Sequence, residues 1–101
     1  MDKKILITYL TKELRFSNKD AQEETDRFIL NATIELQNEF EFYLRHKRFT
    51  GEPITVKGYT AQILIDSKLA ANPYAAYNMM RQLIAEPDKM LQGIQSGFKT
   101  K

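Results

Sequence analysis

The chain of 101 residues contains no cysteine, no tryptophan and a single histidine. Without cysteine it can form neither a disulfide nor a thiolate metal site. One histidine supplies too few nitrogen ligands for a typical transition-metal centre, and no Glu-x-x-His motif is present. We therefore expect no metal and no cofactor.

Proline and glycine are missing from the first fifty residues. All seven of them come later, as Gly51, Pro53, Gly58, Pro73, Pro87, Gly93 and Gly97. Because these two residue types interrupt regular structure, the first half can hold long uninterrupted elements. The second half should consist of short elements joined by turns.

Long hydrophobic runs and a strong net charge are also missing. The longest apolar run near the start, Ile5-Leu6-Ile7, is too short for a signal peptide or a membrane span. The net charge of +2 does not demand a nucleic-acid partner. A content of 43% hydrophobic and 28% charged residues is that of a soluble globular protein. We expect one cytoplasmic domain with no membrane partner.

Helical spacing dominates the first half. Residues 2 to 15 are predicted to form a helix that Asp2 caps. Ser17 is expected to cap a second helix, and apolar residues recur at helical spacing from there on. Acidic residues gather in its first turns and basic ones in its last, as the helix dipole favours. We predict one long helix over residues 18–47. Residues 39–44 also alternate with period two, so a strand there is the open alternative.

The long helix generates a hypothesis about association. Thirty helical residues would span about 45 Å, whereas a compact domain of this size is roughly 34 Å across. A second copy could cover the overhang, so we expect a homo-oligomer. The candidate interface consists of apolar residues of this helix: Phe28, Leu36, Phe40, Phe42, Tyr43 and Leu44.

The second half is predicted to be a loop followed by three short helices over residues 59–97. At most a short extended segment is expected at 53–57. Thr60 should cap the first helix, and Asn72 with Pro73 should open the second. The last helix should start near Pro87 and end at Gly97. The fold class is therefore all-α, with about five helices: a helical hairpin at 1–48 and three short helices after it.

The nucleophilic, histidine and carboxylate residues of the sequence do not form a known catalytic motif. The sequence has no nucleophile elbow and no glycine-rich phosphate loop. His46 lies among three basic residues with no carboxylate beside it, and we interpret it as a helix-end residue. Glu35 and Glu39 are one helical turn apart and are interpreted as a solvated face. We expect that the protein is not an enzyme.

Residues 60–84 have the spacing of a helix-turn-helix, which gives an alternative from another class. In that alternative the protein binds DNA, and the contacts come from the helix after Asn72 and from a basic cluster at residues 45–48. The candidate nucleic-acid contacts are Arg45, Lys47, Arg48, Asn78 and Arg81. The second helix carries only one basic residue, so we do not favour this alternative.

Residues 3 to 38 also resemble the N-terminal helical hairpin of the histone-like HU family. The matching positions are Leu6-Ile7, Leu10, Leu14, Ser17, Asp20-Ala21, Asp26 and Leu36. That family continues with a glycine-rich β-saddle and basic DNA-binding arms, and residues 39 to 101 contain neither. The resemblance therefore implies a helical hairpin and transfers no functional residue. Our leading hypothesis is that the protein is a small non-enzymatic interaction or regulatory module. It would self-associate through its long helix and could also bind a protein partner.

Overall fold

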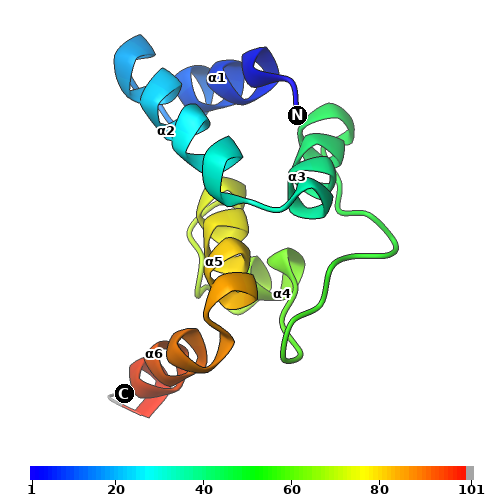
Figure 1. The fold of residues 1–101 in the computed structure, drawn as a ribbon, viewed down its shortest axis with the longest axis vertical. Coiled ribbons are helices and arrows are strands. Elements are labelled where there is room, and N and C mark those ends of the chain that lie inside the picture. Colours follow the sequence, from blue (N-terminus) through cyan, green and yellow to red (C-terminus); the bar gives the residue numbers. More distant parts are fainter. Residues whose placement is uncertain (100–101) are drawn as a thin grey trace. The chain divides into compact units, whose positions relative to one another are not determined.

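A computed structural model describes the backbone of residues 1–99 and the side chains of residues 1–95. Its contacts divide the chain into two compact units, Met1–Glu52 and Pro53–Lys101. The described residues form six α-helices and no strand (Figure 1). The prediction of an all-α fold is confirmed, with one helix more than expected.

The first unit contains α1 (Lys3–Lys12), α2 (Asn18–Asn31) and α3 (Ile34–His46). The predicted caps at Asp2 and Ser17 are confirmed, since their side chains accept hydrogen bonds from the Lys4 and Asp20 backbone N–H groups. Helix α1 packs against both α2 and α3, so it is the central helix of this unit (Figure 1).

The predicted long helix over residues 18–47 is wrong, because the chain leaves the helical conformation between α2 and α3. Ala32 and Thr33 are extended there, with ψ of 145° and 158°. Thr33 starts a new helix, and its hydroxyl accepts a hydrogen bond of 3.2 Å from the Leu36 N–H. The break therefore needs no glycine or proline, which is why the absence of those residues was a misleading guide.

A buried glutamine holds this break in place. Gln37 is 7% exposed, and its Nε2 donates to the carbonyl oxygens of Ile29 at 3.1 Å and Ala32 at 2.9 Å. Both acceptors lie at the end of α2, where carbonyl groups have no partner within the helix. One side chain of α3 thus satisfies two carbonyl groups at the end of α2.

The break also builds an aromatic core. Along a straight helix Phe28 and Phe40 would be separated by about 18 Å, at 1.5 Å per residue. Their ring centroids are instead 5.4 Å apart in an edge-to-face contact, and Tyr9 of α1 meets Phe40 at 6.2 Å. Aromatic pairs of this geometry add stabilisation beyond the area they bury. The alternative of a strand at residues 39–44 is also wrong, since all six lie in α3.

The second unit begins with a loop that contains one tight turn. Val56 and Tyr59 form an isolated antiparallel bridge with hydrogen bonds of 3.0 and 2.9 Å. Lys57 and Gly58 between them have φ of 53° and 85°. Positive φ at both central positions is the requirement of a type I′ turn. The expected extended segment is therefore confined to this bridge.

Three helices follow: α4 (Ala61–Asp66), α5 (Pro73–Ala85) and α6 (Pro87–Lys99). The predicted caps are confirmed, since Thr60 accepts from the Ile63 N–H and Asn72 from the Ala75 N–H. Helix α5 packs against both α4 and α6. The predicted end at Gly97 is wrong, since α6 continues to Lys99. A glycine inside a helix costs only about 1 kcal/mol relative to alanine, which neighbouring residues can offset.

Basic residues occupy backbone positions that usually hold glycine. Arg15, Lys47, Lys57 and Lys68 all have a left-handed conformation, with φ between 53° and 64°. Lys47 ends α3, and Arg15 and Lys68 follow the ends of α1 and α4. A residue with a Cβ atom is strained in this conformation by roughly 1–2 kcal/mol. The chain therefore ends three of its helices without glycine and carries the strain.

We predict that Gln37→Leu destabilises the protein by about 1–3 kcal/mol, because it leaves two carbonyl groups of α2 without their donor at nearly constant side-chain volume. Urea unfolding followed by circular dichroism measures the effect. Gln22→Leu, at an exposed position of α2, is the matched control and should change stability by less than about 0.5 kcal/mol. Equal effects of the two substitutions would contradict the role assigned to Gln37.

We also predict that Lys68→Gly stabilises the protein by up to about 1 kcal/mol, because glycine removes the strain of the left-handed backbone. Lys68 is exposed, so little packing is lost. Lys68→Ala removes the same charge and keeps the Cβ atom, and it should give no stabilisation. Thermal unfolding of both variants measures the difference, and a more stable alanine variant would show that the charge, not the backbone, decides.

Candidate interaction surfaces

The candidate interface residues divide into two groups in the structure. Four of them are buried in the folded chain, with exposed fractions of 4% or less: Phe28, Leu36, Phe40 and Leu44. Phe42 and Tyr43 are half-buried on the outer part of α3. The first four therefore do not form the exposed apolar face on which the self-association hypothesis was built. The overhang that motivated it disappears together with the long helix.

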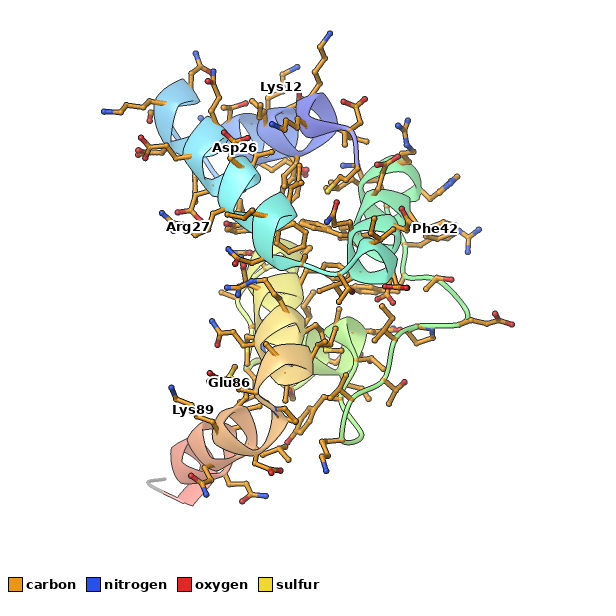
Figure 2. All side chains as sticks on the ribbon, viewed as in Figure 1. Lys12, Asp26, Arg27, Phe42, Glu86 and Lys89 are labelled. Atoms are coloured by element: carbon orange, nitrogen blue, oxygen red, sulfur yellow. The ribbon has the colours of Figure 1, made fainter. Side chains whose placement is uncertain are left out.

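The end of α3 brings together residues from both candidate sets. Half-exposed rings and basic side chains alternate there, and we call this surface the basic aromatic end: Phe42, Tyr43, Arg45, His46, Lys47, Arg48 and Phe49. Phe42 lies on the side of α3 that faces away from α2 (Figure 2). The centroid of the Phe42 ring is 4.4 Å from that of the His46 ring. The Arg48 guanidinium lies 5.2 Å from the centroid of the same Phe42 ring. The Phe42 ring thus packs against two neighbouring planar groups, and its plane is tilted by 41° from that of His46.

A second set of contacts continues this surface toward α1. The Tyr43 and Phe49 rings are 4.8 Å apart, and the Lys47 ammonium lies 5.8 Å from the Tyr9 ring. Next to Lys47 there is a hollow of about 340 Å³ between α1 and α3. It is lined by Ile5, Thr8, Tyr9, Lys12, Glu13, Leu44 and Lys47. The lining is mainly apolar and also holds two lysines and the Glu13 carboxylate.

The basic side chains of this surface differ in their ion pairs. Lys47 lies 3.4 Å from a Glu13 carboxylate oxygen, with both side chains more than half exposed. Among the described residues, no carboxylate lies within ion-pair distance of Arg48. Exposed ion pairs are worth little, so Lys47 can exchange its partner for another anion.

Arg45 is held more firmly, by a small network at the start of the chain. The carboxylate of Glu41 accepts from the Asp2 backbone N–H at 2.9 Å and from Arg45 Nε at 3.0 Å. The backbone hydrogen bond from Asp2, followed by the bond from Arg45, holds the pKa of Glu41 below its usual value. The network ties the residue before α1 to the outer part of α3.

A different surface lies at the break between α2 and α3. Leu30 is 83% exposed and Ile34 is 69% exposed, and the two residues flank the break. We call them the aliphatic corner. Both are apolar residues of the segment 18–47, but at about 3.6 residues per turn they lie on the side opposite Phe28 and Phe40. The available signal was Thr33, a residue type that favours helix N-caps, directly before Ile34.

The two remaining candidate nucleic-acid contacts belong to the second unit. Arg81 Nε donates to Asn78 Oδ1 at 3.4 Å, and Asn78 donates in turn to the Tyr74 carbonyl oxygen. A recognition helix needs an exposed N-terminal part that reaches base edges. In α5 that part is buried at Tyr74, Ala76 and Tyr77. This burial gives no support to a helix-turn-helix.

The carboxylate pair of α3 was interpreted incorrectly in one respect. Glu35 is exposed as expected, but Glu39 is buried, with 8% of its surface accessible. The two carboxylates share a helical side but differ in burial, because only the one at position 39 is covered. Among residues 1–99, no group of three or more histidine or carboxylate side chains is placed to hold a metal ion.

In the part of the chain that the structure describes, no helix combines the length and the apolar character needed to cross a membrane. Comparison of the chain with protein-family models, with curated proteins and with solved structures found no match. Any functional argument therefore comes from the surfaces themselves.

We predict that Glu41→Gln destabilises the protein at neutral pH by about 0.5–1 kcal/mol, since the Glu41 side chain is 24% exposed and solvent screens part of its interactions. A carboxyl whose pKa is lowered in the folded state contributes stability that is fully present above its unfolded pKa, 4.5. That contribution is lost as the pH falls through the lower folded value. The difference between wild type and variant should therefore shrink below pH 4.5.

Urea unfolding at neutral pH and at about pH 3 tests this expectation. Glu23→Gln changes an exposed glutamate in the middle of α2 and is the matched control. It should give no pH-dependent difference. A constant loss of stability for Glu41→Gln at both pH values would mean that the carboxylate charge is not responsible.

Proposed function

We propose that this protein is a small non-enzymatic interaction module of the cell interior that associates with a second copy of itself through the aliphatic corner. The observation that carries the proposal is the exposure of Leu30 and Ile34, at 83% and 69%. Only one other large hydrophobic residue with a described side chain is exposed, Ile63 at 43%. Single exposed apolar residues are common, but two at one corner are typical of an interface.

The charges around the corner favour a second copy as the occupant. Arg27 lies one helical turn before Leu30, and the exposed Glu35 directly follows Ile34. Arg27 pairs within the chain with Glu24 at 2.9 Å, whereas Glu35 has no ion pair among the described residues. A surface that carries both signs around an apolar centre is self-complementary under twofold symmetry. In such a dimer Arg27 of one copy could meet Glu35 of the other.

The expected association is weak. Burying a leucine or isoleucine side chain contributes about 1.5–3 kcal/mol, and a twofold interface would bury two such residues from each copy. Association costs about 4–15 kcal/mol in lost translational and rotational freedom. The most favourable balance is about 8 kcal/mol, which corresponds to a dissociation constant of about 1 µM, and a larger association cost gives a weaker dimer. That strength is suitable for a regulatory module whose assembly responds to its concentration.

The proposal that the module is non-enzymatic rests on the chemistry of its polar groups. The one histidine, His46, is exposed at the end of α3 and contacts the Phe42 ring rather than a carboxylate. The pKa of Glu41 lies below its usual value, which keeps this carboxyl charged at neutral pH. A general acid or base would instead need a pKa near neutrality.

Sedimentation velocity over about 1–100 µM protein tests the proposal, a range that brackets a micromolar dissociation constant. The wild-type protein should shift from the monomer mass of 11.8 kDa toward twice that value. Leu30→Gln and Ile34→Gln should each weaken the dimer by about tenfold or more, the effect of about 1.4 kcal/mol. Ile63→Gln removes an exposed isoleucine of the other unit and should leave the association unchanged. A wild-type protein that remains at 11.8 kDa throughout would refute the proposal.

A further inference from the structure

We propose that the basic aromatic end of α3 is a binding site for single-stranded nucleic acid. This inference is independent of the proposed self-association, which uses a different surface. It also differs from DNA recognition by a helix-turn-helix, because it assigns no contact to α5. The site lies wholly within the first unit.

Planar side chains that can stack on bases gather at the end of α3. The Phe42 ring centroid lies 4.4 Å from the His46 ring, at an interplanar angle of 41°, and the Arg48 guanidinium lies 5.2 Å from the Phe42 ring centroid. His46 and Arg48 are exposed, so planar groups at this surface are open to solvent. Aromatic rings and guanidinium planes are the groups on which unpaired bases stack. In a duplex the faces of the bases are already covered by neighbouring bases. Exposed planar side chains therefore favour single-stranded over double-stranded nucleic acid.

The charges are a second feature of this surface. Arg48 has no carboxylate within ion-pair distance among the described residues, and Lys47 has only an exposed pair with Glu13. Lys12 adds a third exposed cation at the margin of the neighbouring hollow. Arg45 is already engaged by Glu41, so we do not count it. About two or three phosphates can therefore be neutralised at one time.

The hollow beside Lys47 is a third feature. It measures about 340 Å³, and its lining includes Tyr9 and Leu44, the two lysines Lys12 and Lys47, and the Glu13 carboxylate. Tyr43 lies one helical turn before Lys47 on α3, so the Tyr43–Phe49 pair lies near the Lys47 side chain that lines the hollow. A strand that stacks one base on the Phe42 group could place a second base in the hollow. An acidic peptide would use the cations and leave these flat apolar surfaces without a matching group.

Fluorescence anisotropy with a labelled oligothymidine of about 15 nucleotides tests the site, a length in the range that single-strand-binding modules cover. We expect a dissociation constant of about 10⁻⁶–10⁻⁴ M at physiological salt. The logarithm of affinity should fall with the logarithm of salt concentration with a slope between about −1.4 and −2.1, for two or three phosphates. The affinity for an oligouridine of equal length, compared with that for oligothymidine, shows whether the site prefers single-stranded RNA or DNA.

Two substitutions separate stacking from charge. Phe42→Leu keeps the charge and the apolar character, and it should weaken binding by about fivefold or more, the lower end of one stacked base. Arg48→Lys keeps the charge and removes the planar group, and it should also weaken binding with an unchanged salt slope. Arg81→Ala, in the second unit, is the control and should bind like wild type. Because Arg48 is exposed, its variant remains informative even if Phe42→Leu folds poorly.

Three outcomes would overturn the proposal. The first is no binding to either oligonucleotide at about 100 µM protein, the weak limit of non-specific association. The second is equal affinity for a duplex or for a polyglutamate peptide of the same charge, which would identify a general polyanion surface. The third is wild-type affinity in both the Phe42 and Arg48 variants, which would exclude stacking at this site.

Discussion

The buried amide of Gln37 is the interaction on which the first unit depends. It donates to two carbonyl groups at the end of α2 and projects from the first turn of α3. Polar groups removed from water cost free energy unless they find partners, and this single side chain provides two. Together with the Thr33 cap it fixes the point at which a continuous helical sequence changes direction.

The change of direction decides which side of α3 enters the core. It brings Phe28 to Phe40 and so places one side of α3 in the core. Phe42 and His46 lie on another part of the same helix and remain accessible. Leu30 and Ile34 are exposed beside the break, on the side of the helical pattern opposite Phe28 and Phe40. The change of direction thus forms the core, while the basic aromatic end and the aliphatic corner lie on helix sides that the core leaves uncovered.

The shortage of glycine has a second consequence at the ends of helices. Helices commonly end with a left-handed residue, and glycine adopts that conformation without steric cost. Here Arg15, Lys47 and Lys68 take that role. Basic side chains at these positions also interact favourably with the carbonyl ends of the helices. Lys47 is one of them, so the same residue terminates α3 and contributes a cation to the basic aromatic end.

The sequence by itself determined the fold class and the start of most helices. Asp2, Ser17, Thr60 and Asn72 act as caps, and capping depends only on residues within one turn, so it can be read locally. Only the tertiary structure decided where the long apolar pattern breaks, because Gln37 acts on carbonyl groups five and eight residues earlier. The same is true of the candidate surfaces. Periodicity shows that Phe40, Phe42 and Leu30 are apolar positions of a helix, but which of them is buried depends on where α1 packs, and that is a contact between distant parts of the chain.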